Sequence, residues 1–220
     1  MSVNPGPEFT ALGAAFYPDA DVVYRDANCT AVRLREGREP ASLNAGRVEA
    51  WVVSGPVLGH VDPRPDGNYQ AAVRATLPHG TRLAGSVAGT AAVPAHRFRS
   101  PARVPQSVRT TAPSAGFHSD ANHLPEVRWQ GGDSSHVTLQ SSFTRGPLEQ
   151  AQDGLVLTCV VPRTATSFTL PASAARVIPD GADTVALVVT ATDRVQEGDY
   201  AFDVSPIGSA DDVIRGTFTR

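Results

Sequence analysis

The sequence contains no lysine, since all 19 of its basic residues are arginines. The absence excludes a Schiff-base lysine and the phosphate-binding lysine of a P-loop. Two interpretations of the arginine bias stay open: the codon usage of a GC-rich genome, or a use of arginine for bidentate contacts to carboxylate or phosphate. The arginines are scattered along the chain rather than clustered, so they do not form the basic stripe of a nucleic-acid-binding protein.

The sequence also has no long apolar run and no large excess of charge of one sign. No stretch of about 18 apolar residues is present, so we expect no membrane-spanning helix. The 220 residues carry a formal charge of −3, which argues against nucleic acid or an anionic membrane as partner. With 41% hydrophobic residues the chain can build a packed core, and its length suits one large domain or two small ones.

Only two cysteines are present, Cys29 and Cys159. They either pair, which would stabilise the fold by about 4–5 kcal/mol on the chain-entropy estimate, or are buried free thiols. Residues 1–7 have neither the basic nor the apolar region of a signal peptide. Their Pro/Gly/Asn-rich composition favours an extracytoplasmic protein (secreted, periplasmic or on the surface) whose leader is not part of this chain. A cytoplasmic protein is the alternative.

The pattern of the chain is that of an all-β protein. Short runs of β-branched and aromatic residues alternate with turn residues, as is typical of sandwiches and barrels. One short helix is expected near 171–178, between Pro171 and the turn that begins at Pro179. Strands are expected at residues 30–34, 47–53, 69–75, 81–87, 104–110, 125–129, 136–142, 155–161, 167–170, 183–191, 200–204 and 213–218.

Turn and loop residues are densest at 112–124, which suggests a linker. We therefore expect two tandem antiparallel sandwiches of the immunoglobulin or fibronectin type, at 1–105 and 125–220, joined through 106–124. A single larger sandwich is the alternative.

The most polar cluster lies in that linker. The H-x-D-x-x-H spacing of His118, Asp120 and His123 could supply three ligands to zinc or another divalent metal. A solvated hydrophilic loop explains the same residues without a metal. No other cofactor and no catalytic residue is indicated, because the sequence has no nucleophile elbow, dinucleotide fingerprint or H-E-x-x-H motif.

Aromatic residues suggest a second kind of site. Trp51 is out of phase with Val48, Ala50 and Val52 on its strand, so its side chain should face away from their core. Together with Tyr69 it could stack on a sugar ring. Trp129 shares the phase of its apolar neighbours and should pack inside the second sandwich.

The second half of the chain also resembles a known group. Residues 126–132 (Glu-Val-Arg-Trp-Gln-Gly-Gly), 157–159 (Leu-Thr-Cys), 167–172 (Ser-Phe-Thr-Leu-Pro-Ala) and 178–181 (Ile-Pro-Asp-Gly) resemble, in this order, secreted or lipid-anchored two-domain β-sandwich proteins of high-GC bacteria. The shared motifs are structural, so the resemblance implies a fold and no activity. This chain has no lipobox cysteine, so lipid anchoring is not expected.

These observations favour a non-enzymatic extracytoplasmic protein with a binding, adhesion or structural role. Its partner would be a protein or a glycan, and its oligomeric state is left open. Two alternatives come from the candidate sites: a metal-dependent hydrolase that uses His118, Asp120 and His123, and a carbohydrate-binding module that uses Trp51 and Tyr69.

Overall fold

The computed structural model describes residues 2–5, 10–14, 22–34, 44–64, 69–73, 77–146, 154–205 and 213–220. These parts confirm an all-β fold, in which most strand pairs are antiparallel. The strands are β1 (Ser2–Pro5), β2 (Thr10–Ala14), β3 (Val22–Arg25), β4 (Cys29–Leu34), β5 (Val48–Val52), β6 (Val57–Val61), β7 (Tyr69–Val73), β8 (Arg82–Val87), β9 (His96–Arg97), β10 (Ala102–Arg103), β11 (Val108–Ala112), β12 (Phe117–Asp120), β13 (Glu126–Gly131), β14 (His136–Thr144), β15 (Gly154–Pro162), β16 (Ser167–Thr169), β17 (Thr184–Glu197), β18 (Tyr200–Val204) and β19 (Ile214–Thr219).

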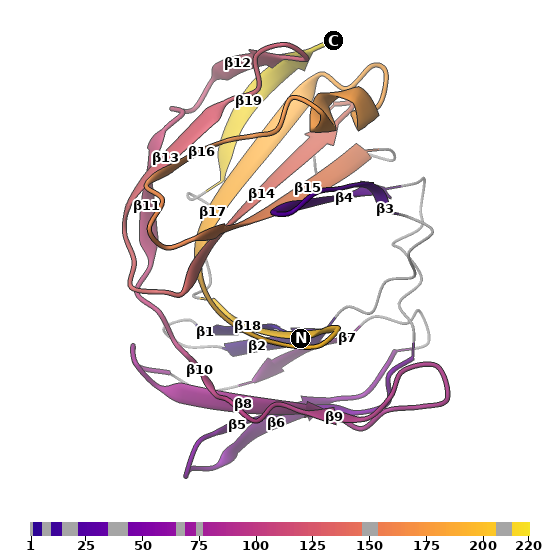
Figure 1. Ribbon diagram of the computed structural model, residues 1–220, viewed down its shortest axis with the longest axis vertical. Coiled ribbons are helices and arrows are strands. Elements are labelled where there is room, and N and C mark those ends of the chain that lie inside the picture. The colour runs from indigo at the N-terminus through magenta and orange to yellow at the C-terminus, as the bar shows by residue number, and fades with distance from the viewer. Residues whose placement is uncertain are drawn as a thin grey trace.

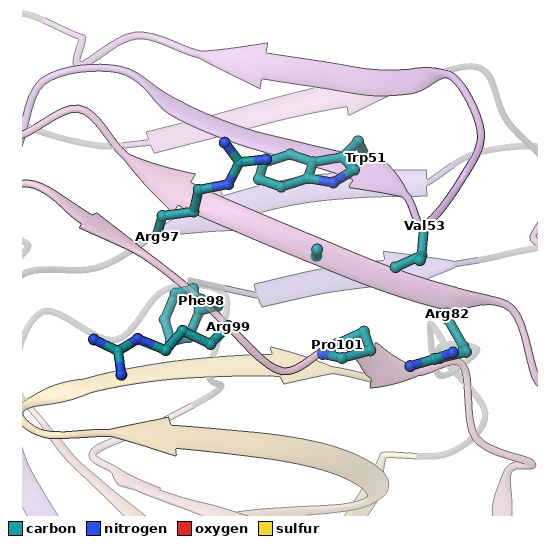
Figure 2. Close-up of a pocket in the computed structure, with 8 residues that line it drawn as sticks. Trp51, Val53, Arg82, Arg97, Phe98, Arg99 and Pro101 are labelled. Carbon is teal, nitrogen blue, oxygen red and sulfur yellow. The ribbon is translucent and has the colours of Figure 1, made fainter.

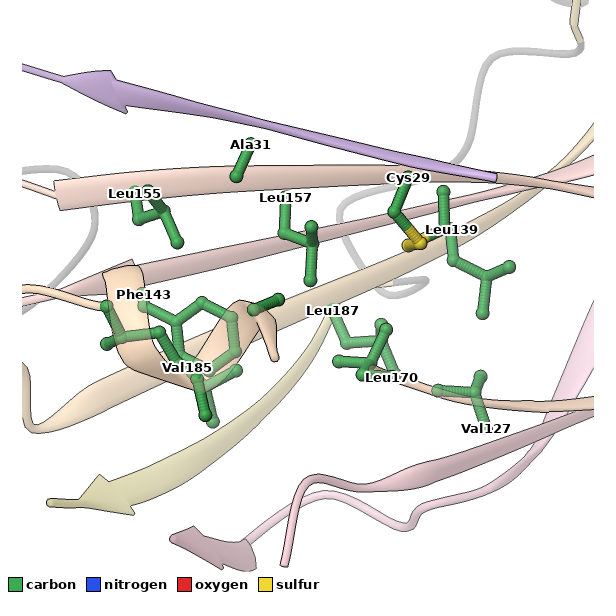
Figure 3. Packing of buried hydrophobic residues seen from close by; sticks show 14 of the residues in the cluster. Cys29, Ala31, Val127, Leu139, Phe143, Leu155, Leu157, Leu170, Val185 and Leu187 are labelled. Atoms are coloured by element: carbon green, nitrogen blue, oxygen red, sulfur yellow. A yellow bond between two sulfur atoms is a disulfide. The ribbon is translucent and has the colours of Figure 1, made fainter. Parts of the chain in front are cut away.

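One sandwich forms the upper half of the molecule in Figure 1. Its larger layer contains β3, β4, β15, β14, β17, β19 and β12, and its smaller layer is the sheet β11-β13-β16. Alternate residues of β14 and β15 point between the layers, and Leu139, Phe143, Leu155 and Leu157 are at most 1% exposed. Figure 3 shows these side chains packed together with the disulfide. Trp129 is 4% exposed in the same core, which confirms the orientation expected from its phase.

The second sandwich forms the lower half. One layer is the sheet β10-β8-β5-β6, with β9 paired to β8, and the other contains the end of β17 followed by β18, β1, β2 and β7. Val48, Leu83, Phe98 and Phe202 meet in its core. We call this half the lower sandwich and its β10-β8-β5-β6 layer the lower sheet.

The long strand β17 belongs to both halves. Residues 184–192 pair with β14, while residues 193–197 pair with β18. At the point of transition the Asp193 carboxylate accepts hydrogen bonds from the backbone N–H groups of Arg103 (2.6 Å) and Ser135 (3.2 Å). Asp133 accepts one from the N–H of Gln106 (2.8 Å). The junction is therefore fixed by carboxylates that hold backbone groups.

Each of the two hydrophobic cores contains residues from both halves of the sequence. Cys29 and Ala31 lie in the upper core, which is otherwise built from residues 127–218, and Phe202 and Val204 lie in the lower core with residues 45–104. The division into 1–105 and 125–220 stays a prediction about independently folding units.

The short helix expected near 171–178 is a single 3₁₀ turn, Ala174–Val177. Ile178 has extended backbone angles (φ −63°, ψ 131°), as the residue before Pro179 favours, so the turn ends there. Ala174 and Ala175 are buried against the upper core.

Cys29 and Cys159, whose pairing the sequence left open, form a disulfide. The two residues are direct register partners of β4 and β15. No helix in the described parts of the chain is long and apolar enough to cross a membrane.

Candidate functional site

The outer face of the lower sheet carries a hollow of about 460 Å³. Its walls come from the end of β5, the start of β8, and β9 with the segment that follows it, and include Trp51, Arg82, Arg97, Arg99 and Pro101 (Figure 2). We call it the arginine hollow. Its size lies within the range of pockets that hold small ligands.

Strand alternation places these side chains outside. On β5, Val48 and Ala50 are buried in the lower core, so Trp51 projects from the other face, as its phase predicted. On β8, Leu83 and Val87 are buried and Arg82 is exposed. Trp51 and Ala84 are direct cross-strand partners, and the small Ala84 leaves room beside the indole.

Arg97 lies over the indole of Trp51. The guanidinium carbon is 4.9 Å from the ring centroid, a cation–π contact, and Figure 2 shows the two side chains side by side. Such a contact restrains a long arginine side chain while the N–H groups at the edge of the guanidinium plane can still donate.

Arg82 and Arg99 add two further positive charges to the hollow. Within the part of the chain that the structure describes, neither of them nor Arg97 is ion-paired with a carboxylate. Several other arginines are ion-paired, including those of the pairs Arg47–Asp62, Arg128–Glu126 and Arg194–Asp203. Among the described residues, Arg82 and Arg97 thus lie in the hollow without an ion-paired carboxylate, while Arg99 lies near the carboxylate of Glu197.

The segment with Arg97 and Arg99 is held against the sandwich. Phe98 is 4% exposed in the lower core, and its N–H donates to the carbonyl of Gly85 (3.1 Å). The N–H groups of Arg99 and Ser100 donate to Oε1 of Glu197, at 2.8 and 3.2 Å. The backbone that presents the two arginines is therefore anchored to both layers.

The contacts of Glu197 lower the pKa of its carboxyl. Burial acts to raise this pKa, but the backbone N–H groups of Arg99 and Ser100 and the nearby positive charge of Arg99 act against burial and lower it. The ring of His96 stacks on Tyr200, with centroids 4.5 Å apart, and its Nε2 lies 3.3 Å from Oε2 of Glu197.

The three expected metal ligands do not meet at one point. His123 Nδ1 lies 3.1 Å from both carboxylate oxygens of Asp120, whose Oδ1 also accepts from the backbone N–H groups of Asn122 and His123. His118 instead makes hydrogen bonds to Thr217 Oγ1 (3.0 Å) and Thr219 Oγ1 (3.3 Å) on β19.

The Asp120 contacts lower the pKa of its carboxyl, mainly through the N–H of Asn122. Among the described residues no three His, Cys, Asp or Glu side chains are grouped as metal ligands.

The second expected sugar-binding aromatic, Tyr69, begins β7, where its backbone is the register partner of Ala14. Its side chain lies outside what the structure describes. The expectation that Trp51 and Tyr69 share one binding surface stays a prediction.

Sequence reasoning missed the three arginines. Two signals could have found them: Arg82 precedes the inward Leu83, and Arg97 and Arg99 flank Phe98, so alternation places all three on the outer side. The sequence did not show which strand the segment with Arg97 and Arg99 pairs with.

Comparisons with known proteins add little. No protein-family model matches the sequence, and no curated protein matches it. Among solved structures the chain is similar to the fibronectin(III)-like modules of Clostridium thermocellum CbhA, with 10% identity, a TM-score of 0.27, and coverage of 99% of this chain and 89% of that chain. A score this low carries no argument about relationship or function. The fold is that of an all-β sandwich protein with one disulfide between Cys29 and Cys159.

Proposed function

We propose that the protein is a non-enzymatic extracytoplasmic binding module that takes its ligand on the outer face of the lower sheet, around Trp51. The observation that carries the proposal is the arginine hollow, where an outward Trp51 and the three arginines Arg82, Arg97 and Arg99 line one concave surface. Exposed aromatic and charged side chains on a rigid sheet provide contacts for binding, whereas the described residues that line the hollow include no acid–base pair or nucleophile.

The disulfide supports the proposed location. Disulfides such as Cys29–Cys159 persist in oxidising compartments and are rare in the cytosol of most organisms. A secreted, periplasmic or surface protein fits this chemistry.

Tryptophan fluorescence tests the proposal directly, because the chain has two tryptophans and one of them is buried. We expect a saccharide panel that includes neutral and acidic oligosaccharides to contain members that change the emission of the wild-type protein. The change should disappear in Trp51→Phe, in which Trp129 is the remaining emitter. A flat response across the panel would count against the proposed binding function, and a response that survives in Trp51→Phe would place the site elsewhere.

A further inference from the structure

We propose that the ligand of the arginine hollow is an acidic saccharide, a chain of sugar rings that bear carboxylates. The inference rests on the proposed function and specifies its ligand class. It starts from the guanidinium groups of Arg82 and Arg97, which line one hollow and form no ion pair with a carboxylate in the described parts of the chain. Arg99 adds a third positive charge, which the nearby carboxylate of Glu197 offsets in part. Oxyanions of a ligand would pair with Arg82 and Arg97, whereas a neutral ligand offers them no charged partner.

Arg97 is oriented to bind a carboxylate of the ligand. Its stacking on Trp51 orders the side chain, and a guanidinium edge donates two parallel N–H bonds that match the two oxygens of a carboxylate. Because the arginine is held before the ligand arrives, less conformational entropy is lost on binding.

The rest of the surface suits the apolar C–H faces of sugar rings. Val53 and Pro101 line the hollow together with Trp51. Val57 is 65% exposed and is the direct cross-strand partner of Trp51, so it extends the apolar surface on the same face.

An acidic peptide fits this place less well. β5 is hydrogen-bonded on both sides, to β6 and to β8, and β8 is paired with β9 and β10 on its other side. The strands beneath the hollow therefore offer no free edge to the backbone of an extended peptide, whose amides would have to find partners elsewhere. A saccharide has no such requirement.

The test is titration calorimetry at low salt, with a short oligogalacturonate and its fully methyl-esterified form as probes. We expect the acid to bind and the neutral ester to bind at least about tenfold more weakly. Arg97→Gln and Arg82→Gln should each weaken binding of the acid at least about tenfold. The matched control is Arg109→Gln on β11 of the upper sandwich, an exposed arginine that should leave affinity unchanged. Melting curves of the variants verify that each is folded.

Three results would overturn the inference, and they differ in what they leave standing. If the neutral ester binds as tightly as the acid and Trp51→Ala abolishes both, the proposed function holds and the acidic ligand is wrong. If poly-glutamate binds as tightly as the oligogalacturonate with the same dependence on Arg97, the ligand is an acidic peptide. If neither probe binds and the saccharide panel is also silent, both the inference and the proposed function fail.

Discussion

At the scale of single residues, the two tryptophans lie in opposite environments: Trp51 lines the arginine hollow, and Trp129 is 4% exposed in the upper core. Their positions relative to the apolar neighbours on each strand predicted one tryptophan outside and one inside, and the structure confirms both. What phase could not supply is the partner across the strand. That Arg97 lies over Trp51 depends on β9 pairing with β8, a contact between segments separated in the chain.

Removal of the disulfide gives a prediction at this scale. The bond closes a separation of 130 residues, so the double variant Cys29→Ala/Cys159→Ala should lose about 5 kcal/mol of unfolding free energy on the chain-entropy estimate. Urea denaturation of wild type and variant measures the difference. A loss below about 1 kcal/mol would show that the unfolded chain is not constrained as that estimate assumes.

The lowered pKa of Asp133 predicts that the junction between the two sandwiches loses stability in acid. The N–H of Gln106 lowers the pKa of its carboxyl against the opposing effect of burial, and His79 lowers it further. A depressed pKa in the folded state means that the stabilisation is present above the ordinary aspartate pKa of about 3.9 and is lost as pH falls through the folded value.

Below about pH 4, wild type should therefore lose stability more steeply than Asp133→Asn, although the variant starts from lower stability at neutral pH. Urea midpoints measured from neutral to acidic pH give the two slopes. Equal slopes would mean that Asp133 does not contribute to the acid sensitivity.

At the scale of elements, the loop between β8 and β9 determines the position of Arg97 and Arg99. Gly89 in this loop has φ +83°, and a Cβ there would lie 2.4 Å from the backbone nitrogen of Ala95. Gly80 has a similar φ of +82° with nothing within 4 Å of such a Cβ, which makes it the matched control.

Gly80→Ala should cost about 1 kcal/mol of backbone strain, and Gly89→Ala more than about 3 kcal/mol, because the chain at Ala95 must move. Denaturant unfolding of both variants gives the comparison. Since the loop leads directly into β9, Gly89→Ala should also weaken ligand binding, whereas Gly80→Ala should not. Equal costs for the two variants would contradict the close approach seen at Gly89.

The strands show which elements a sequence can predict. β14 and β15 were expected within a few residues of their observed bounds, because long alternating or continuously apolar runs leave few choices. β17 was expected to end at 191 but continues to Glu197. The polar residues Thr192, Asp193 and Arg194 are typical of the end of a strand. Their side chains instead form hydrogen bonds with Thr138, the backbone of Ser135 and Asp203, respectively. The sequence alone does not show these partners.

At the scale of the whole molecule, β17 and the Asp193 contacts join the two sandwiches mechanically. We expect wild type to unfold in a single calorimetric transition. Replacing both junction carboxylates, in Asp133→Ala/Asp193→Ala, should split it into two, because the backbone N–H groups of Arg103, Ser135 and Gln106 lose their side-chain acceptors. Two separate transitions in the wild-type protein would show that the halves are independent despite the shared strand.

The arrangement of the two cores was only partly predictable. Two apolar groups separated by a turn-rich segment suggested two sandwiches, and two cores are present. That β4 joins the upper sandwich and β18 the lower one depends on long-range strand pairing, for which a single sequence offers no local signal. The sequence pointed to the candidate site through one residue, Trp51. The positive charge of the site was missed, because only strand pairing brings the three arginines together beside Trp51.

The central claim is that ligand binds beside Trp51 on the lower sheet. Its most direct test is the ¹⁵N–¹H NMR spectrum of the protein titrated with oligogalacturonate, in which the two indole N–H signals report separately on the exposed and the buried tryptophan. The signal that disappears in Trp51→Phe should shift progressively with added ligand, while that of Trp129 stays in place. A titration in which neither indole signal moves, or in which that of Trp129 alone moves, would contradict the account.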